Sequence, residues 1–345
     1  MRLPSGCGSR ADLDARMTDG SPDPSFDHRA LLYAWEEEFI AGALPFVREG
    51  LSRDEPVMVV ATARKCDRLA QALNGDGPGT VEFVDMGELG RNPARILPAW
   101  QEFVDRHPGS SIRGVGEPAW GDRSSDALIE CHRHESLLNL AFGESAGFSL
   151  LCPYDISDLP SDVVDRARRT HPSLIEDGQP RTSPIYLSPR ASAGPFAGQL
   201  RPPPAEAVTS EFSRELDLSR LRSLVSERAL AAGLAPARAA DLALAVSELA
   251  ANSLHHGGSR GTLAIWEEGD AVVCEVRDTG WITEPLAGRR RPEPIALRGR
   301  GLWVVNHLCD LVQIRSSSVG TAVRVRVEAD AERRDARRGE PPHAA

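Results

Sequence analysis

A proline-rich stretch between Gln179 and Ala207 constrains this chain more than any other feature. It reads QPRTSPIYLSPRASAGPFAGQLRPPPAEA and holds seven prolines, the last three of them consecutive. Proline fixes φ and removes an N–H donor, so such a segment cannot maintain a helix or a central strand. We therefore interpret 179–209 as a semi-extended linker. A chain of 345 residues is also too long for one ordinary core, which predicts two domains, at 26–178 and 210–330.

The two ends of the chain have little to bury. Residues 1–25 are polar and rich in Gly, Ser and Asp, and the tail 331–345 is mostly charged, so we expect both to be disordered. The N-terminus lacks the apolar segment of a signal peptide, and no apolar run approaches the roughly 20 residues that span a bilayer. The six cysteines lie far apart and form no CxxC pair. We expect a cytoplasmic protein with no membrane partner.

The charge balance argues against a nucleic-acid surface. Acidic residues number 50 and basic residues 40, which gives a net charge of −10 and a pI near 5.5. Neutralising the phosphates of DNA or RNA needs clustered Lys and Arg, whereas the basic residues here are scattered. We expect no direct nucleic-acid partner.

The first domain alternates short apolar runs with helical patterns. The runs read as buried strands, and the segments between or after them carry apolar residues at helical spacing. We expect strands at 56–63, 80–85, 111–116 and 148–155, and helices at 64–73, 94–106, 125–142 and 161–169. Repeated alternation of strand and helix predicts βαβ units, and therefore an α/β domain with a largely parallel sheet.

The second domain has a different order of elements. We expect helices at 218–232, 237–255 and 299–308, and strands at 262–268, 271–278, 311–317 and 321–328. Helices on one side of a mostly antiparallel sheet make an α+β layer. The last strand alternates, with Val323, Val325 and Val327 predicted to face inward and Arg324 and Arg326 outward.

Polar residues and glycines recur in the second domain at four places. Glu248 and Asn252 lie one turn apart on the helix DLALAVSELAANSLHHGG. The strand AVVCEVRDTG ends in Asp278, with Gly280 after it. Two further glycines open the helix RGRGLWVVNHLCD, where backbone N–H groups can approach a phosphate, and Gly320-Thr321 begins the final strand. Each signal alone has an ordinary structural explanation, such as a surface pair, a turn or a helix start.

The ordered set is more specific than its parts. E-x-x-x-N on a helix, then strand-D-x-G, then G-x-G opening a helix, then G-T before a strand resembles the N, G1 and G2 boxes of the GHKL (Bergerat) ATPases. The wording SELAANSLHHGG, VRDTG, RGRGLWVVNHLCD and GTAVRVRV most resembles the anti-sigma-factor serine/threonine kinase branch. The resemblance covers about 120 residues.

The resemblance implies ATP and Mg²⁺ as cofactors. It makes Glu248 the catalytic base that activates the attacking hydroxyl, Asn252 the Mg²⁺ ligand, and Asp278 the acceptor for the adenine amino group. Thr321 would assist Asp278 through water, and Gly299 and Gly301 would make room for the triphosphate. The full set assigned to the nucleotide is Asn252, Asp278, Gly280, Gly299, Gly301 and Thr321. Positioning, a hard cation and one carboxylate near the nucleophile are what phosphoryl transfer needs.

The segment 282–297 corresponds to the nucleotide lid of that family. Arg289, Arg290 and Arg291 within it would lie near the phosphates, although a solvated charged loop is an equal alternative. Trp281 and Ile282 stand where the family has a small, flexible pair. We therefore expect a stiffer lid hinge and slower turnover.

The resemblance implies a kinase that phosphorylates an anti-anti-sigma partner, sequesters a sigma factor, or does both, and members of this branch often form homodimers. One alternative is a module that binds a partner and uses ATP only as a structural ligand. Another is a histidine-kinase-like ATPase. That class places an H-E-x-x-P-type phosphoacceptor just before the ATPase domain, whereas here His134-Glu135 lies in the first domain without the proline. We interpret His134 as a satisfied helical histidine.

The first domain has its own resemblance. The phrases FDHRALLYAWEEEFIAGALPFVREGLSRDEPVMVVATARKCDRL, RGVGEPAW, LLCPYD and THP resemble the MEDS sensory domain, a RecA-like α/β module of bacterial regulators. No G-x-x-x-x-G-K-[ST] phosphate loop is present, which favours sensing of a small-molecule or protein signal over catalysis. Residues in these phrases that could bind a ligand, or be structural, are His28, Glu117, Trp120, Tyr154 and His171. The spacing of Cys131, His132, His134 and Cys152 matches no zinc pattern.

Overall fold

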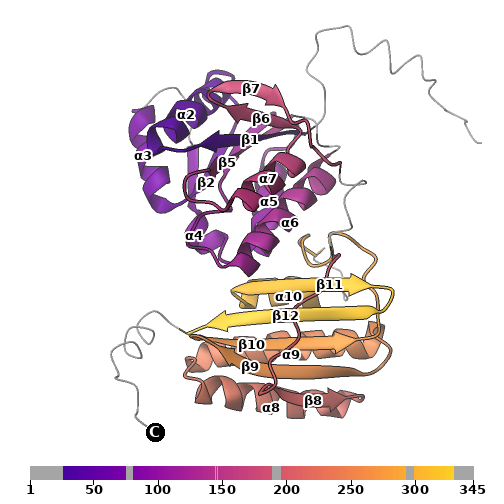
Figure 1. The fold of residues 1–345 in the computed structure, drawn as a ribbon. Helices are drawn as coiled ribbons and strands as arrows, with labels where there is room; N and C mark the ends of the chain where they lie inside the picture. Colours follow the sequence, from indigo (N-terminus) through magenta and orange to yellow (C-terminus); the bar gives the residue numbers. More distant parts are fainter. Residues whose placement is uncertain are drawn as a thin grey trace, which may run out of the picture.

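The computed structural model describes residues 26–74, 81–143, 145, 147–188, 196–292 and 299–329. They form an N-terminal α/β domain and a C-terminal domain in which helices pack on an antiparallel sheet (Figure 1). The predicted fold class is confirmed for both domains. The ends predicted to be disordered, 1–25 and 331–345, lie outside the described residues.

The N-terminal domain is built on a seven-stranded sheet of order β3-β2-β4-β5-β1-β6-β7. The strands β1 to β6 pair in parallel, and only β7 is antiparallel to its neighbour β6. Their bounds are β1 Asp27–Tyr33, β2 Val57–Ala61, β3 Val81–Asp85, β4 Ile112–Gly116, β5 Phe148–Asp155, β6 Ser173–Glu176 and β7 Gln179–Thr182.

Helices cover both faces of this sheet. Side chains of β1 alternate between the two layers, with Ala30 and Leu32 in one core cluster and Leu31 and Tyr33 in the other. The second cluster includes residues of α2 (Glu36–Ser52) and α3 (Ala63–Leu73), whereas the first includes residues of α5 (Ile96–Arg106), α6 (Ser125–Phe142) and α7 (Ser161–Thr170). Two short helices, α4 (Met86–Leu89) and η2 (Pro93–Arg95), complete the domain.

Sequence patterning missed several elements of this domain. The strand β1 lies inside the sheet between β5 and β6, yet its opening residues Asp27, His28 and Arg29 are polar and give no apolar run. The strand β7 lies in the range predicted as linker. It is an edge strand, where a proline is tolerated.

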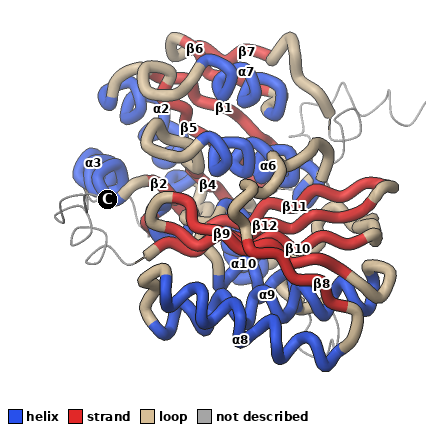
Figure 2. The backbone as a smooth tube through the Cα atoms, turned by 60° about the horizontal axis from the view of Figure 1, so that its bottom comes forward, coloured by secondary structure: helices blue, strands red, loops and turns tan. Residues whose placement is uncertain are grey.

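The C-terminal domain has a five-stranded antiparallel sheet of order β11-β12-β10-β9-β8. The strands are β8 Val208–Phe212, β9 Gly261–Glu268, β10 Ala271–Asp278, β11 Leu311–Ser317 and β12 Gly320–Glu328. Three helices, α8 (Glu215–Ala231), α9 (Pro236–His256) and α10 (Gly301–Leu308), contribute to the same core cluster as one face of the sheet. Figure 2 shows α8 and α9 as a layer beside the strands.

The opposite face of this sheet is partly covered by the chain that joins the domains, which crosses it in Figure 1. Val323, Val325 and Val327 lie in the core cluster, as predicted. Arg324 lies on the other face but is 7% exposed, because it pairs with the buried Glu275 at 2.6 Å and donates to the carbonyl of Arg201. Arg324 thus faces outward from the core, as predicted, but a segment distant in sequence covers it.

Within the described ranges, no helix combines the length and apolar character needed to cross a membrane.

Candidate functional site

Helix α9 carries the first part of the site. It begins at Pro236, which suits a first helical turn, and ends before Gly257. Its buried face, which includes Ala245 and Leu249, packs into the domain core. Glu248 and Asn252 are half-buried beside that face and are separated by one turn.

Asp278 stands at the end of β10 and is held by two hydrogen bonds. Ser253 donates its hydroxyl to Oδ2 at 2.6 Å, and the backbone N–H of Gly280 donates to Oδ1 at 2.7 Å. A Cβ added at Gly257 would lie 2.4 Å from Cγ of Asp278, so only glycine lets the end of α9 approach this carboxyl group. The carboxylate is therefore fixed in place, with lone pairs left to accept from a ligand.

Thr321 joins the start of β12 to the same turn. Its hydroxyl donates to the carbonyl of Gly280 at 2.8 Å and lies 2.7 Å from Oγ of Ser316, which accepts from the N–H of Ile282. Ile282 also packs against the domain core, whereas Trp281 is 63% exposed. Ile282 is therefore held at two points, by a hydrogen bond to its backbone and by core packing of its side chain.

The N-terminus of α10 closes the site. A Cβ added at Gly301 would lie 2.9 Å from Nδ2 of Asn252 and 3.1 Å from Oε2 of Glu248. Gly299, with φ of 87°, makes the turn into the helix. Two segments about 50 residues apart in sequence thus bring a carboxylate, an amide and the positive end of a helix dipole together.

These segments surround a cavity of about 460 Å³, a size typical of small-molecule sites. The predicted nucleotide residues line it: Asn252, Asp278, Gly280, Gly299, Gly301 and Thr321. Leu249, Val276 and Ile282 add apolar walls. Glu248 stands beside the cavity, behind Gly301, rather than in its wall.

The segment after Ile282 does not bring Arg289 toward the cavity. Arg289 is 4% exposed and lies 3.9 Å from Glu130 of the N-terminal domain, and Leu286 is buried in that domain's core cluster. The expectation that Arg289 lies near phosphates was therefore wrong, because a buried acidic partner in the other domain attracts it. Arg290 and Arg291 are exposed, and 293–297 lie outside the described residues.

The N-terminal domain also holds the far end of α10. Arg95 donates to the carbonyls of Asn306, His307 and Cys309 at 3.0, 2.6 and 3.2 Å, and Asn92 donates to that of Asn306 at 2.9 Å. These are carbonyls that a helix C-terminus leaves unsatisfied. A second tie runs from Glu130 on α6 to Arg315 on β11 at 2.9 Å, with both side chains buried. The domain interface therefore includes α10, whose N-terminus lines the candidate nucleotide cavity, and the lid segment at Leu286 and Arg289.

Comparison with protein families decides the identity of both halves. Residues 27–172 match the family described as MEDS, the MEthanogen/methylotroph, DcmR Sensory domain, and residues 213–327 match the histidine kinase-like ATPase domain. The chain is an MEDS domain followed by a histidine kinase-like ATPase domain. An ATPase domain implies nucleotide binding. No curated protein matches the chain significantly.

The chain is also similar to part of a solved structure. It is the crystal structure of the RsbU and RsbW domains of a Mycobacterium tuberculosis protein, with 18% identity and a TM-score of 0.27. The match covers 35% of this chain and 32% of that one, so this chain spans about a third of its relative.

In the MEDS domain, three of the five residues singled out from the sequence meet. The ring centroids of His28 and His171 lie 4.0 Å apart, and the ring of Tyr154 is edge-on to that of His171. The three side chains also share one neighbour. This neighbour is the buried Glu135. From the sequence, Glu135 was noted only as the residue after His134 and was not predicted as a site residue. Its position on the apolar face of the predicted helix 125–142 is the sequence signal that could have identified it.

The other two residues lie elsewhere. Glu117 follows β4 and is fully buried, where it accepts hydrogen bonds from Tyr33 and from Lys65, the latter at 2.6 Å. Burial raises the pKa of Glu117, although Lys65 opposes that shift. Trp120 stacks beneath Arg123, whose guanidinium lies 3.7 Å from the ring centroid.

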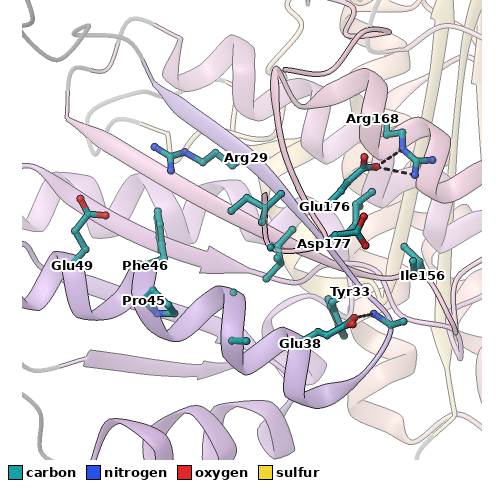
Figure 3. A pocket seen from close by; sticks show the side chains of 17 residues that line it. Arg29, Tyr33, Glu38, Pro45, Phe46, Glu49, Ile156, Arg168, Glu176 and Asp177 are labelled. Atoms are coloured by element: carbon teal, nitrogen blue, oxygen red, sulfur yellow. Dashed lines mark hydrogen bonds and ion pairs between the residues drawn. The ribbon is translucent and has the colours of Figure 1, made fainter. Parts of the chain in front are cut away.

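The MEDS domain also has the larger hollow, of about 950 Å³, between β1, α2 and the turn that joins β6 to β7 (Figure 3). Pro45 and Phe46 form part of an apolar wall. Several charged side chains that line the hollow already have partners within the protein. Arg168 pairs with Glu176 at 3.0 Å, and Glu38 accepts a hydrogen bond from the N–H of Ala34. This hollow could take a small-molecule ligand separate from the nucleotide.

Proposed function

We propose that the chain is a cytoplasmic signalling regulator in which the MEDS domain controls an ATP- and Mg²⁺-dependent serine/threonine protein kinase of the anti-sigma-factor type. The domain limits are those read from the sequence, 26–178 and 210–330, joined by the linker 179–209. In this proposal the domain phosphorylates a serine or threonine of an anti-anti-sigma protein, sequesters a sigma factor, or does both. A single observation supports the nucleotide role best: the four sequence motifs converge at one cavity of about 460 Å³.

The proposed roles follow the geometry of that cavity. Asp278, oriented by Ser253 and Gly280, accepts from the adenine amino group, with Thr321 beside it. The apolar walls pack on the base. At the other end Asn252 is the Mg²⁺ ligand, and amide and carboxylate oxygens are what this hard cation prefers.

Glu248 is the proposed general base. It lies next to Asn252 and to the N-terminus of α10, at the phosphate end. A positioned general base contributes about 10² to 10⁴-fold, so most of the rate would come from the cation and the oriented N–H donors. The N–H groups after Gly299 and Gly301 suit the phosphates.

The domain interface supports control by the MEDS domain. Its contacts reach Leu286 and Arg289 of the lid segment, and the C-terminal carbonyls of α10, whose N-terminus faces the cavity. The hollow of Figure 3 is a candidate site for a signal molecule. In this proposal the domain interface has two arrangements that differ in nucleotide affinity. A signal that binds one arrangement more tightly than the other would shift the population and so change that affinity.

Two alternatives remain open. A non-catalytic module that binds a partner and holds ATP structurally is favoured by the anchored hinge at Ile282. A histidine-kinase-like ATPase is disfavoured because α8, the helix that leads into α9, contains no histidine.

Phosphoryl transfer from labelled ATP to candidate anti-anti-sigma proteins separates the kinase from both alternatives. The proposal expects acid-stable label on the partner, lost by at least about 10²-fold in Glu248→Ala. Glu227→Ala, an exposed helical carboxylate on α8, is the matched control and should transfer normally. Binding of ATP without transfer would favour the non-catalytic module, and acid-labile label on the chain itself would favour a histidine kinase.

A further inference from the structure

Four side chains with metal-binding atoms meet in the core of the MEDS domain. They are His28 on β1, Glu135 on α6, Cys152 on β5 and His171 just after α7. Their ligand atoms all lie within 4.8 Å of one another, and no member is more than 1% exposed. This cluster belongs to neither the nucleotide cavity nor the hollow of Figure 3.

The hydrogen bonds around His28 determine which of its ring nitrogens carries a proton. Asn139 donates its amide Nδ2 to the carbonyl of Thr170 at 2.7 Å, so its Oδ1 must face Nδ1 of His28, at 3.0 Å. An amide oxygen only accepts, and therefore Nδ1 of His28 is the donor. In neutral His28 the lone pair is then on Nε2, which points at Glu135.

His171 is fixed in the same sense. Its Nδ1 lies 2.8 Å from the carbonyl of Ala167, a pure acceptor, so Nδ1 carries a proton, and in neutral His171 the lone pair is on Nε2. That Nε2 is 3.3 Å from Oε2 of Glu135 but forms no hydrogen bond. Oε1 of Glu135 is buried and makes no hydrogen bond of ordinary geometry, although the Tyr154 hydroxyl lies close to this carboxylate.

With both rings neutral, the cluster is rich in electron pairs and short of positive charge. Two imidazole lone pairs, a thiol and a carboxylate converge, and among the described residues no Lys or Arg side chain forms an ion pair with Glu135. A buried carboxylate that faces lone pairs is costly unless a cation compensates it.

We propose that His28, Glu135, Cys152 and His171 bind one divalent transition-metal cation of the zinc class. Two nitrogens, one sulfur and one carboxylate oxygen are a usual ligand set for a four-coordinate site. Bonds of about 2.0 to 2.3 Å place tetrahedral ligands about 3.3 to 3.7 Å apart. Three separations lie in that range: His28 Nε2 to Cys152 Sγ at 3.3 Å, Glu135 Oε2 to His171 Nε2 at 3.3 Å, and Glu135 Oε2 to Cys152 Sγ at 3.5 Å. A fourth, from His28 Nε2 to Glu135 Oε2, is shorter, at 3.0 Å.

The outer contacts agree with this assignment. Metal-binding histidines almost always donate their second ring N–H to a carbonyl or carboxylate, which fixes the tautomer and ring orientation. Here Asn139 and the carbonyl of Ala167 fill that role for His28 and His171.

The first experiment measures metal content of the full chain expressed in zinc-supplemented medium and purified under reducing conditions. Expression with metal present is required because all four ligands are buried. Elemental analysis should find close to one zinc ion per chain, largely lost in Cys152→Ser and His171→Ala. Cys131→Ser is the matched control, since Cys131 is also a buried thiol of this core but bonds to the carbonyl of Pro118. It should keep its metal.

A cobalt-substituted sample tests the thiolate directly. Wild-type and Cys131→Ser protein should show a sulfur-to-cobalt charge-transfer band, and Cys152→Ser should lose that band while circular dichroism shows a native fold. The proposal is overturned if the folded wild-type chain carries neither zinc nor cobalt, because a proton then balances Glu135. It is also overturned if metal is bound equally by wild type, Cys152→Ser and His171→Ala, because the ion then lies elsewhere.

Discussion

Replacing Gly301 by alanine separates nucleotide binding from stability. Gly301 is the first residue of α10 and does not have a positive φ, so alanine fits its backbone. An added Cβ would lie 2.9 Å from Nδ2 of Asn252 and 3.1 Å from Oε2 of Glu248. Both atoms are at the ends of flexible side chains that can move aside. We expect the free energy of unfolding to change by less than about 1 kcal/mol, because alanine is the better helix residue by about that amount.

The binding of ATP should change much more. The methyl group displaces Asn252 from the proposed Mg²⁺ position and occupies space beside the helix N-terminus. Loss of one or two hydrogen bonds to a charged group is worth about 1.5 to 3 kcal/mol, which corresponds to about 10- to 150-fold in Kd. Adenosine lacks the phosphates, so its affinity should be nearly unchanged.

Isothermal titration with ATP and Mg²⁺, and separately with adenosine, measures both quantities, and thermal unfolding measures stability. The reasoning is refuted if Gly301→Ala binds ATP as wild type does. It is also refuted if ATP and adenosine affinities fall equally, because the effect would then not arise at the phosphate end.

Three further variants test other parts of the structure. Asp278→Ala should weaken ATP and adenosine alike, by about 10- to 150-fold, since it removes the proposed acceptor for the base; an effect confined to ATP would contradict that role. Arg95→Ala removes three hydrogen bonds to the end of α10. Amide hydrogen exchange at 299–309 should therefore accelerate, while exchange in β9 stays as in wild type. Unchanged exchange at 299–309 would show that the interface does not hold the helix. Asn139→Leu frees the ring of His28 and should lower metal affinity by about 10- to 100-fold in a chelator competition, with retained affinity as the contrary result.

The sequence predicted the parts of the fold that depend on local patterning. Apolar runs located β2, β4, β5 and β10, and helical spacing located α6 and α9, because each carries its own periodic signal. The strand β1 has no such signal, since His28 and Arg29 interrupt its apolar run. The polar ring of His28 can be buried because its two nitrogens contact Asn139 and Glu135, which lie more than 100 residues away in sequence.

The nucleotide residues could be named from sequence because four short motifs occur in a fixed order. Two other predictions required knowledge of the whole fold. Arg289 is drawn to Glu130 across the domain interface, and Arg324 is covered by the joining segment at Arg201. The histidine and cysteine cluster was missed because its ligands come from four separate elements, whereas the spacing of neighbours such as Cys131 and His134 suggested no site.

We propose that one pocket binds magnesium-bound nucleotide, formed by α9, the end of β10, the N-terminus of α10 and the start of β12. Calorimetric titration of the full chain with ATP in the presence and absence of Mg²⁺ tests it most directly. We expect saturable binding at one site, strengthened by Mg²⁺, with that strengthening lost in Asn252→Ala. Absence of binding heat at any temperature tried, or an Asn252→Ala chain that responds to Mg²⁺ as wild type does, would contradict it.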